Sequence, residues 1–154
     1  MLSSFFTPTC IKIGLESIEK EECFAELLEL LVPINKNLQR SQALQSLIER
    51  EEKLSTAVFP KVAVPHAVCK SISKTSLAIG ISQKAIEFDS PLADNLETVS
   101  VNVIFEILFE ENDTQSRLDI LRDILALVSN QDFLQDLLSA KTQQQVYDII
   151  RSYE

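Results

Sequence analysis

The sequence predicts an α/β fold in which a mixed β-sheet is flanked by helices on both faces, within a single domain over residues 1–154. The length of 154 residues suits one domain with one hydrophobic core. Helical patterns come first, strand patterns occupy the middle, and helical patterns close the chain. Because helices and strands are grouped rather than strictly alternating, we expect a mixed sheet rather than a purely parallel one.

The N-terminal part predicts a short strand and a first helix. Residues 10–13 alternate in polarity, as a short strand does. Ser17 is the predicted N-cap of the helix, because glutamates follow it and negative charge stabilises a helix N-terminus. Pro33 is expected to end the helix. Helical spacing predicts that it buries four apolar residues: Phe24, Leu27, Leu28 and Leu31.

A second helix is predicted over residues 41–53. Its buried side is expected to contain Leu44, Leu47 and Ile48. Its charged run is typical of a solvated face, so Glu49, Glu51 and Glu52 are expected to point outward. In that interpretation, Arg50 merely pairs with neighbouring carboxylates.

Strands are predicted in the middle of the chain. They cover residues 62–64, 75–82, 85–88 and 99–108. Pro65 ends the first of them, because proline cannot donate to a sheet ladder and restricts the residue before it. Residues 93–98 are expected to form a loop. Residues 99–108 are apolar on both faces, which is typical of a central strand covered on both sides.

Three helical patterns close the chain. The first predicts a buried stripe made of Leu118, Leu121, Ile124, Leu125 and Val128. Asn130 and Thr142 are the predicted N-caps of the other two helices, because their side chains can accept hydrogen bonds from first-turn N–H groups.

The composition argues against several classes of function. The net charge is −9, from 14 basic and 23 acidic residues without a basic cluster, so neither nucleic acid nor an anionic membrane surface is expected as a partner. Neither GxGxxG nor GxxxxGK[ST] occurs. Cys10, Cys23 and Cys69 form no CxxC pair, so we expect no metal, no other cofactor and a reducing compartment. Without a signal peptide or an apolar run of about 18 residues, the chain is predicted to be cytoplasmic, with no direct membrane insertion.

His66 is the first candidate for chemistry, because it is the only histidine in the chain. Its position directly after Pro65 predicts a strand end or a loop, where reactive side chains are commonly displayed. Imidazole there can accept a phosphoryl group and release it. A phosphohistidine would need cationic donors, and Arg50 and Arg117 at predicted helix edges are the candidates.

Other interpretations of these residues stay open at this stage. A lone His66 can be structural or merely exposed, and Arg117 can be a solvent-facing residue paired with Asp113 or Asp119. A Cys69–His66 pair is conceivable, although a free cysteine is more often a small buried side chain. A Ser-His-Asp hydrolase is not supported, because the GxSxG motif is absent.

The segment from Arg50 through His66, R-E-E-K-L-S-T-A-V-F-P-K-V-A-V-P-H, resembles the phosphoacceptor region of the IIA components of the bacterial phosphotransferase system. It is most similar to the mannitol/fructose class (PTS EIIA type-2), which includes the nitrogen-regulatory IIA proteins, and the resemblance covers most of the chain. It implies that His66 is phosphorylated, that Arg50 is the active-site arginine and that Thr56 lies in the matching loop and binds the phosphate. It also implies an HPr-like phosphocarrier protein as donor, and a IIB component or regulatory target protein as the next partner.

The chain departs from the family pattern in two places. Ala57, Phe59 and Lys61 stand where the family usually has a glycine-rich loop, and Arg117 stands where it often carries a second histidine. Two hypotheses follow: a phosphoryl carrier that accepts on His66, or a non-transferring regulatory protein-binding module with a degenerate IIA site. Only under the first is the chain a phosphohistidine phosphotransferase component. The absence of IIB and membrane segments from the sequence favours the nitrogen-regulatory branch.

Overall fold

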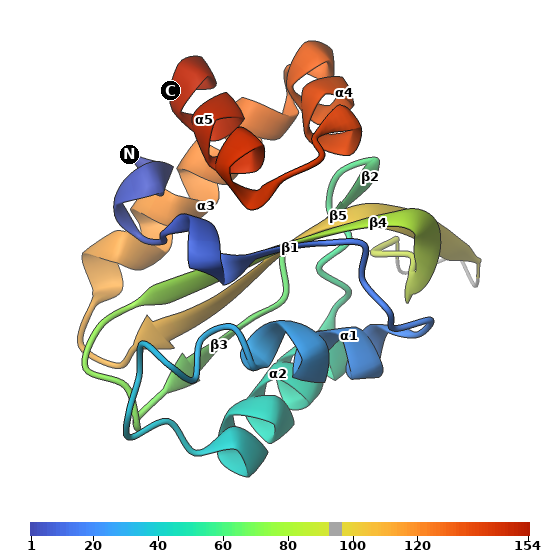
Figure 1. Cartoon of the computed structure of the whole chain (residues 1–154). Helices are drawn as coiled ribbons and strands as arrows, with labels where there is room; N and C mark the ends of the chain where they lie inside the picture. The colour runs from blue at the N-terminus through green and yellow to red at the C-terminus, as the bar shows by residue number, and fades with distance from the viewer. Residues whose placement is uncertain (93–96) are drawn as a thin grey trace.

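The computed structural model describes residues 1–92 and 97–154, which form a five-stranded sheet between two layers of helices (Figure 1). The strands are β1 (Ile11–Ile13), β2 (Lys61–Ala63), β3 (His66–Cys69), β4 (Ser76–Asp89) and β5 (Thr98–Glu110). The helices are α1 (Lys20–Leu28), α2 (Arg40–Lys53), α3 (Thr114–Val128), α4 (Gln131–Ser139) and α5 (Gln143–Tyr153), preceded by the 3₁₀ turns Leu2–Ser4 and Pro8–Cys10. Most of the predicted loop 93–98 lies outside the described residues.

The sheet is mixed, as predicted. Its order is β1-β4-β5-β2, and β3 pairs with β5 as well. The central pair β4–β5 is antiparallel, whereas β1, β2 and β3 run parallel to their partners. β2 pairs with the first half of β5 and β3 with its last four residues, so β2 and β3 follow one another along one edge of the sheet.

Helices cover both faces of the sheet, which confirms the predicted fold class. α1 and α2 pack on one face, and α3, α4 and α5 lie on the other (Figure 1). Gly80 in β4 permits the close approach of α1, because a Cβ at this position would lie 2.9 Å from a methyl carbon of Leu27. None of the helices among the described residues is long and apolar enough to cross a membrane.

The predicted ends of the first helix were wrong. Its N-cap is Glu19 rather than Ser17, whose backbone N–H and hydroxyl both donate to the carboxylate of Glu26. α1 also ends before Pro33, because the chain tightens into 3₁₀-type turns in which Leu30 N–H donates to the Leu27 carbonyl. The predicted apolar side chains are nevertheless all buried.

Two predicted strands, 75–82 and 85–88, form the single strand β4. Its pairing with β5 shifts register between Ile81 and Ile86, and this irregularity contains the polar residues that resembled a break in the sequence. The side chain of Asn102 bridges the irregularity by donating to the Ser82 carbonyl at 2.9 Å. The short strands at 10–13 and 62–64 and the long strand at 99–108 were predicted correctly to within two residues.

α4 and α5 begin as predicted, because Asn130 and Thr142 cap them with their side chains. α3 buries only part of the predicted stripe. Its buried residues are Ile120, Ile124, Leu127 and Val128, of which Ile124 and Val128 were predicted, and Leu121 packs partly buried against the core. Leu118 and Leu125 are 69% and 47% exposed, so the prediction that they belong to the buried stripe was wrong.

Glu106 is a carboxyl group in the centre of the sheet. It is fully buried on β5, and neither of its carboxylate oxygens has a hydrogen-bond partner within residues 1–92 and 97–154. Burial raises the pKa of Glu106 well above its usual range, so the folded protein holds it in the neutral form.

This burial predicts a pH-dependent stability. The unfolded chain releases the Glu106 proton near pH 4, whereas the folded chain keeps it, so folding stability falls by about 1.4 kcal/mol per pH unit above that point until the folded pKa is reached. Replacing Glu106 with methionine should remove this loss. In urea unfolding, the stability of Glu106→Met relative to the unmodified chain should rise from pH 5 to pH 8. A relative stability that stays constant or falls with pH would contradict this prediction.

Candidate functional site

His66 lies in an open groove of about 380 Å³ at the edge of the sheet. β3 is the outer strand here, so side chains of α2 from one face and of α3 from the other line the same groove. The groove is lined by Ser46, Glu49, Arg50, Lys53, His66, Ala67, Val68, Phe109, Arg117 and Leu121. Three of the four predicted site residues, His66, Arg50 and Arg117, are therefore brought together; Thr56 is not among the lining residues.

The His66 ring is held in one orientation. Its Nδ1 lies 2.8 Å from the Val64 carbonyl, and its ring meets Phe109 edge-on at 5.8 Å between centroids. A carbonyl can only accept, so Nδ1 carries the proton and the neutral ring leaves the lone pair on Nε2. Burial lowers the pKa of His66, the Val64 hydrogen bond opposes this shift, and the charge of Arg50 adds to it. The imidazole is consequently neutral and nucleophilic at pH 7.

Arg50 comes from the last turn of α2, and its guanidinium is only partly used. One Nη1 hydrogen bond runs to the Leu54 carbonyl at 2.8 Å. Among the described residues, no carboxylate lies within ion-pair distance of Arg50, so the interpretation as a surface ion pair was wrong. The remaining donors are free for an anion in the groove.

Arg117 reaches the groove from the first turn of α3. It donates to the Glu111 carbonyl at 3.0 Å, and its guanidinium carbon lies 6.0 Å from the centroid of the Phe109 ring. Its Nε is buried and has no hydrogen-bond partner in the described part of the chain. No ion pair joins it to Asp113 or Asp119 within the described residues. Arg117 is half-buried rather than solvent-facing.

Sequence reasoning missed Lys53 as a groove residue. It lies three positions after Arg50, so both side chains project from the same face of α2. The same run contributes one opposing charge, because Glu49 also lines the groove and accepts a hydrogen bond from Gln45. The groove thus combines three cationic side chains with one carboxylate. Helical spacing counted from Arg50 could have found Lys53, and spacing counted back four residues from Lys53 could have found Glu49.

Thr56 and Glu51 form a separate buried pair behind the groove. The prediction that Glu51 points outward was wrong: it is 5% exposed, and Thr56 is 2% exposed. The carboxylate of Glu51 accepts from the Thr56 backbone N–H at 3.0 and 3.1 Å and from its hydroxyl at 2.9 Å. The predicted contact of Thr56 with a phosphoryl group would require the hydroxyl to leave Glu51.

The loop before His66 makes its turn without glycine. Lys61 has a φ of 67°, a left-handed conformation that disfavours residues with a Cβ by about 1–2 kcal/mol. The adjoining turn is closed by the Val62 N–H, which donates to the Phe59 carbonyl at 3.0 Å. The altered loop therefore keeps a backbone conformation that glycine would adopt without strain.

Cys69 lies three positions after His66 on β3. It is buried beside Ser71, with 3.2 Å between the Cys69 Sγ and the Ser71 Oγ. Side chains three residues apart on a strand point to opposite faces. The two side chains therefore do not face each other, and the interpretation of Cys69 and His66 as a catalytic pair is not supported. Within the described residues, no group of three potential metal ligands is found.

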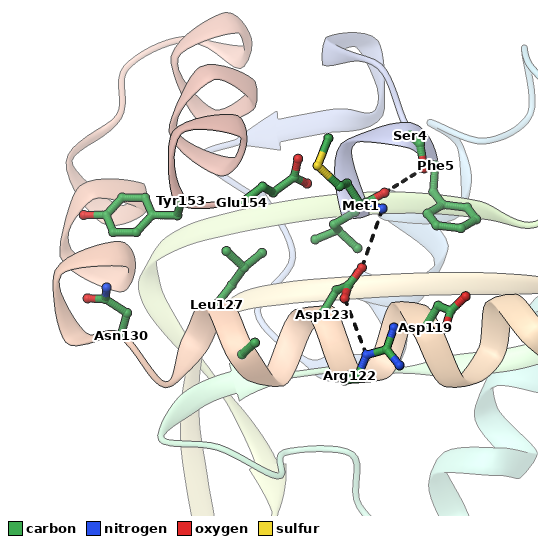
Figure 2. A pocket seen from close by; sticks show the side chains of 12 residues that line it. Met1, Ser4, Phe5, Asp119, Arg122, Asp123, Leu127, Asn130, Tyr153 and Glu154 are labelled. Carbon is green, nitrogen blue, oxygen red and sulfur yellow. Dashed lines mark hydrogen bonds and ion pairs between the residues drawn. The ribbon is translucent and has the colours of Figure 1, made fainter.

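A second cavity, of about 410 Å³, lies between the N-terminal turn, α3 and the C-terminal end (Figure 2). Its charged groups already pair with one another: Arg122 contacts Asp119 at 3.0 Å, and Asp123 lies 3.9 Å from both Arg122 and the Met1 ammonium. We assign no chemistry to this cavity, because its charges are satisfied by its own walls.

Comparisons with known proteins identify a family model and several relatives that match this chain. The family model described as "Phosphoenolpyruvate-dependent sugar phosphotransferase system, EIIA 2" matches residues 4–153. A fructose-specific EIIA component of Haloferax volcanii is 29% identical over 131 residues, covering 85% of this chain and 82% of that protein. A nitrogen regulatory protein of Pseudomonas aeruginosa is 23% identical over 149 residues, covering 97% and 94%. A fructose-specific EIIABC component of Bacillus subtilis is 25% identical over 99% of this chain, which spans only 23% of that protein's length.

Solved structures share the fold. The nitrogen regulatory protein IIA-Ntr of Neisseria meningitidis superposes with a TM-score of 0.86 at 23% identity, over 97% of this chain and 98% of that one. The IIA protein in a complex of Escherichia coli mannitol IIA with phosphorylated IIB gives a TM-score of 0.77 at 16% identity, over 96% and 97%. The family match over nearly the whole chain establishes that this protein belongs to the EIIA type 2 family of the phosphoenolpyruvate-dependent sugar phosphotransferase system.

Proposed function

We propose that this protein is a phosphoryl carrier that accepts a phosphoryl group on Nε2 of His66. The observation that carries the proposal is the Nδ1 hydrogen bond to the Val64 carbonyl, because it leaves the Nε2 lone pair available in the groove. Nε2 attacks the phosphorus of a phosphohistidine on an HPr-like donor. A new N–P bond forms as the donor's N–P bond breaks, and the donor imidazole leaves with the electron pair.

The groove offers the charge that this transfer needs. A phosphoryl group in transit spreads negative charge over its oxygens, and positioned cations stabilise that charge. Arg50, Lys53 and Arg117 supply three such cations. Arg50 and Arg117 have unused donors, and guanidinium matches the geometry of phosphate oxygens. We assign them to phosphate binding, and leave the Thr56 contact as a prediction.

The surroundings of the groove suit a protein partner. Val68 on β3 lines the groove and is exposed, and Leu118 next to Arg117 on α3 is exposed as well, so apolar surface adjoins the cationic side chains. The mannitol IIA protein of Escherichia coli, which shares this fold, forms a complex with phosphorylated IIB. We infer that the phosphoryl group comes from an HPr-like protein and passes to a IIB component, or that its presence regulates a target protein.

Incubation with phosphoenolpyruvate, enzyme I and an HPr-type carrier tests this function. We expect one acid-labile, base-stable phosphate per chain, attached to Nε2 in ³¹P and ¹⁵N NMR spectra. Omitting the HPr-type carrier should abolish labelling. A folded chain that takes up no phosphate from any HPr-type carrier would contradict the proposal.

One observation favours the alternative of a non-transferring regulatory module: Thr56, a residue of the matching loop, is already occupied by Glu51. A module of this kind would bind its target equally well with and without phosphate on His66. Calorimetric titration of a binding target with the unmodified chain and with His66→Asp, a mimic of the phosphorylated form, separates the two functions.

A further inference from the structure

We propose that Glu51 is a positioning residue that fixes the His66 ring through Thr56 and Val64. It would act without touching the phosphoryl group. The kinetic part of this proposal rests on the phosphoryl-carrier function, whereas the orientation of the unphosphorylated ring can be tested by itself.

The first link joins the end of α2 to the loop. Glu51 lies in the last turn of the helix, and its buried carboxylate receives both donors of Thr56, the N–H and the hydroxyl. Two donors on one residue and two acceptor oxygens on the other define a single relative orientation. The loop therefore leaves α2 in one conformation.

The second link joins Thr56 to the segment before His66. The Thr56 carbonyl accepts from the Val64 N–H at 3.0 Å, and the Val64 carbonyl accepts from His66 Nδ1 at 2.8 Å. Val64 thus contacts the loop with its N–H and the catalytic ring with its carbonyl. Thr56 and Val64 are both buried, so water does not compete for these bonds.

The opposite side of the segment is anchored to the sheet. The Ile107 N–H of β5 donates to the Pro65 carbonyl at 2.9 Å. The Val64 carbonyl belongs to the planar peptide unit that joins Val64 to Pro65, so this bond holds one side of that unit. The Val64 N–H bond to Thr56, which Glu51 anchors, holds the other side, and the two anchors together set the direction of the carbonyl.

A glutamate suits this position because a carboxylate only accepts. The pKa of Glu51 is raised, chiefly by burial, and the Thr56 hydrogen bonds and the charges of Lys20 and Arg50 oppose this shift. Aspartate would be one carbon too short to reach Thr56 from the same helical position. Glutamine could accept through its one oxygen, but its NH₂ group would place a buried donor where glutamate has its second acceptor oxygen.

The single histidine makes the ring orientation measurable. In protein labelled with ¹⁵N-histidine, the only imidazole reports its tautomer through its two nitrogen shifts. The unmodified chain should show a protonated Nδ1 and an unprotonated Nε2. Glu51→Ala should shift the ring toward a mixture of tautomers and lower the phosphorylation rate by about a hundredfold, since small misplacements of a reacting group have effects of this size.

Glu52→Ala is the matched control, because it removes the same charge from the next, exposed residue of α2. It should leave both nitrogen shifts and the phosphorylation rate unchanged. Thr56→Ser keeps both donors and should leave the two nitrogen shifts unchanged. Thr56→Val keeps the N–H but loses the hydroxyl, and should give a smaller shift than Glu51→Ala.

These measurements distinguish the possible failures. A folded Glu51→Ala protein with an unchanged tautomer would overturn the proposal. If Glu51→Ala does not fold, identical spectra of Thr56→Val and Thr56→Ser would overturn it instead. If the unmodified chain takes up no phosphate, the carrier function fails, but the tautomer shifts still decide whether Glu51 positions His66.

Discussion

Replacing His66 with alanine is expected to abolish phosphorylation by the HPr-type carrier completely. The chain contains no second imidazole, and this one lies in the cationic groove. Other nucleophiles near it are poorly placed: Cys69 is buried on the opposite side of β3, and Thr56 is bound by Glu51. The measurement is radiolabel transfer from phosphoenolpyruvate in the presence of enzyme I and the carrier.

Lys70→Ala is a suitable control, because Lys70 is exposed just beyond β3 and does not line the groove. It should be labelled like the unmodified chain. His66 is half-buried against Phe109, so circular dichroism should accompany the assay to show that His66→Ala is folded. Equal labelling of the folded His66→Ala variant would refute the assignment of the phosphoacceptor.

Replacing Arg50 with alanine should lower the rate of phosphoryl transfer by about 10²–10³-fold, the usual effect of removing one positioned donor from a charged transition state. Arg50→Lys should recover part of the rate, since it restores the charge but not the planar donor pair. Rapid-quench measurement of phosphoryl transfer from the phosphorylated carrier gives both rates.

Arg50→Ala should also change the titration of His66. The charge of Arg50 lowers the pKa of the ring, so its removal should raise the pKa observed by NMR. Arg40→Ala is the control from the same helix, because Arg40 pairs with Glu29 at 2.8 Å away from the groove. An unchanged rate for Arg50→Ala would exclude Arg50 from phosphate binding.

The fold class could be predicted because apolar periodicity separates strands from helices here. The errors arose where periodicity is ambiguous. In α3, apolar residues surround most of the helix, so the spacing fits Leu118 and Leu125 as well as the stripe that is buried. In β4, the polar residues after Ile81 resemble a turn, but β5 continues the pairing beyond them.

The site could be predicted in part, because Arg50 and His66 belong to one recognisable segment. Glu51 was misjudged because an acidic run at the end of a helix resembles a solvated surface. Its partner Thr56 lies beyond the helix, and helical spacing does not report such a contact. The place of Lys53 in the groove is a consequence of helical spacing in α2, and the Arg50–His66 motif does not indicate it.

The parallel pairing of β3 with β5 has a consequence for biosynthesis. Arg50, Lys53 and His66 are all made early, but within the described residues β3 pairs only with β5, which also carries Phe109, and Arg117 comes later still in the chain. β4 and β5 are adjacent in sequence and antiparallel, so this local pair can form first during folding. A nascent chain on the ribosome would carry the phosphoacceptor histidine long before it has a groove. The site becomes competent only when the last strand and α3 have emerged.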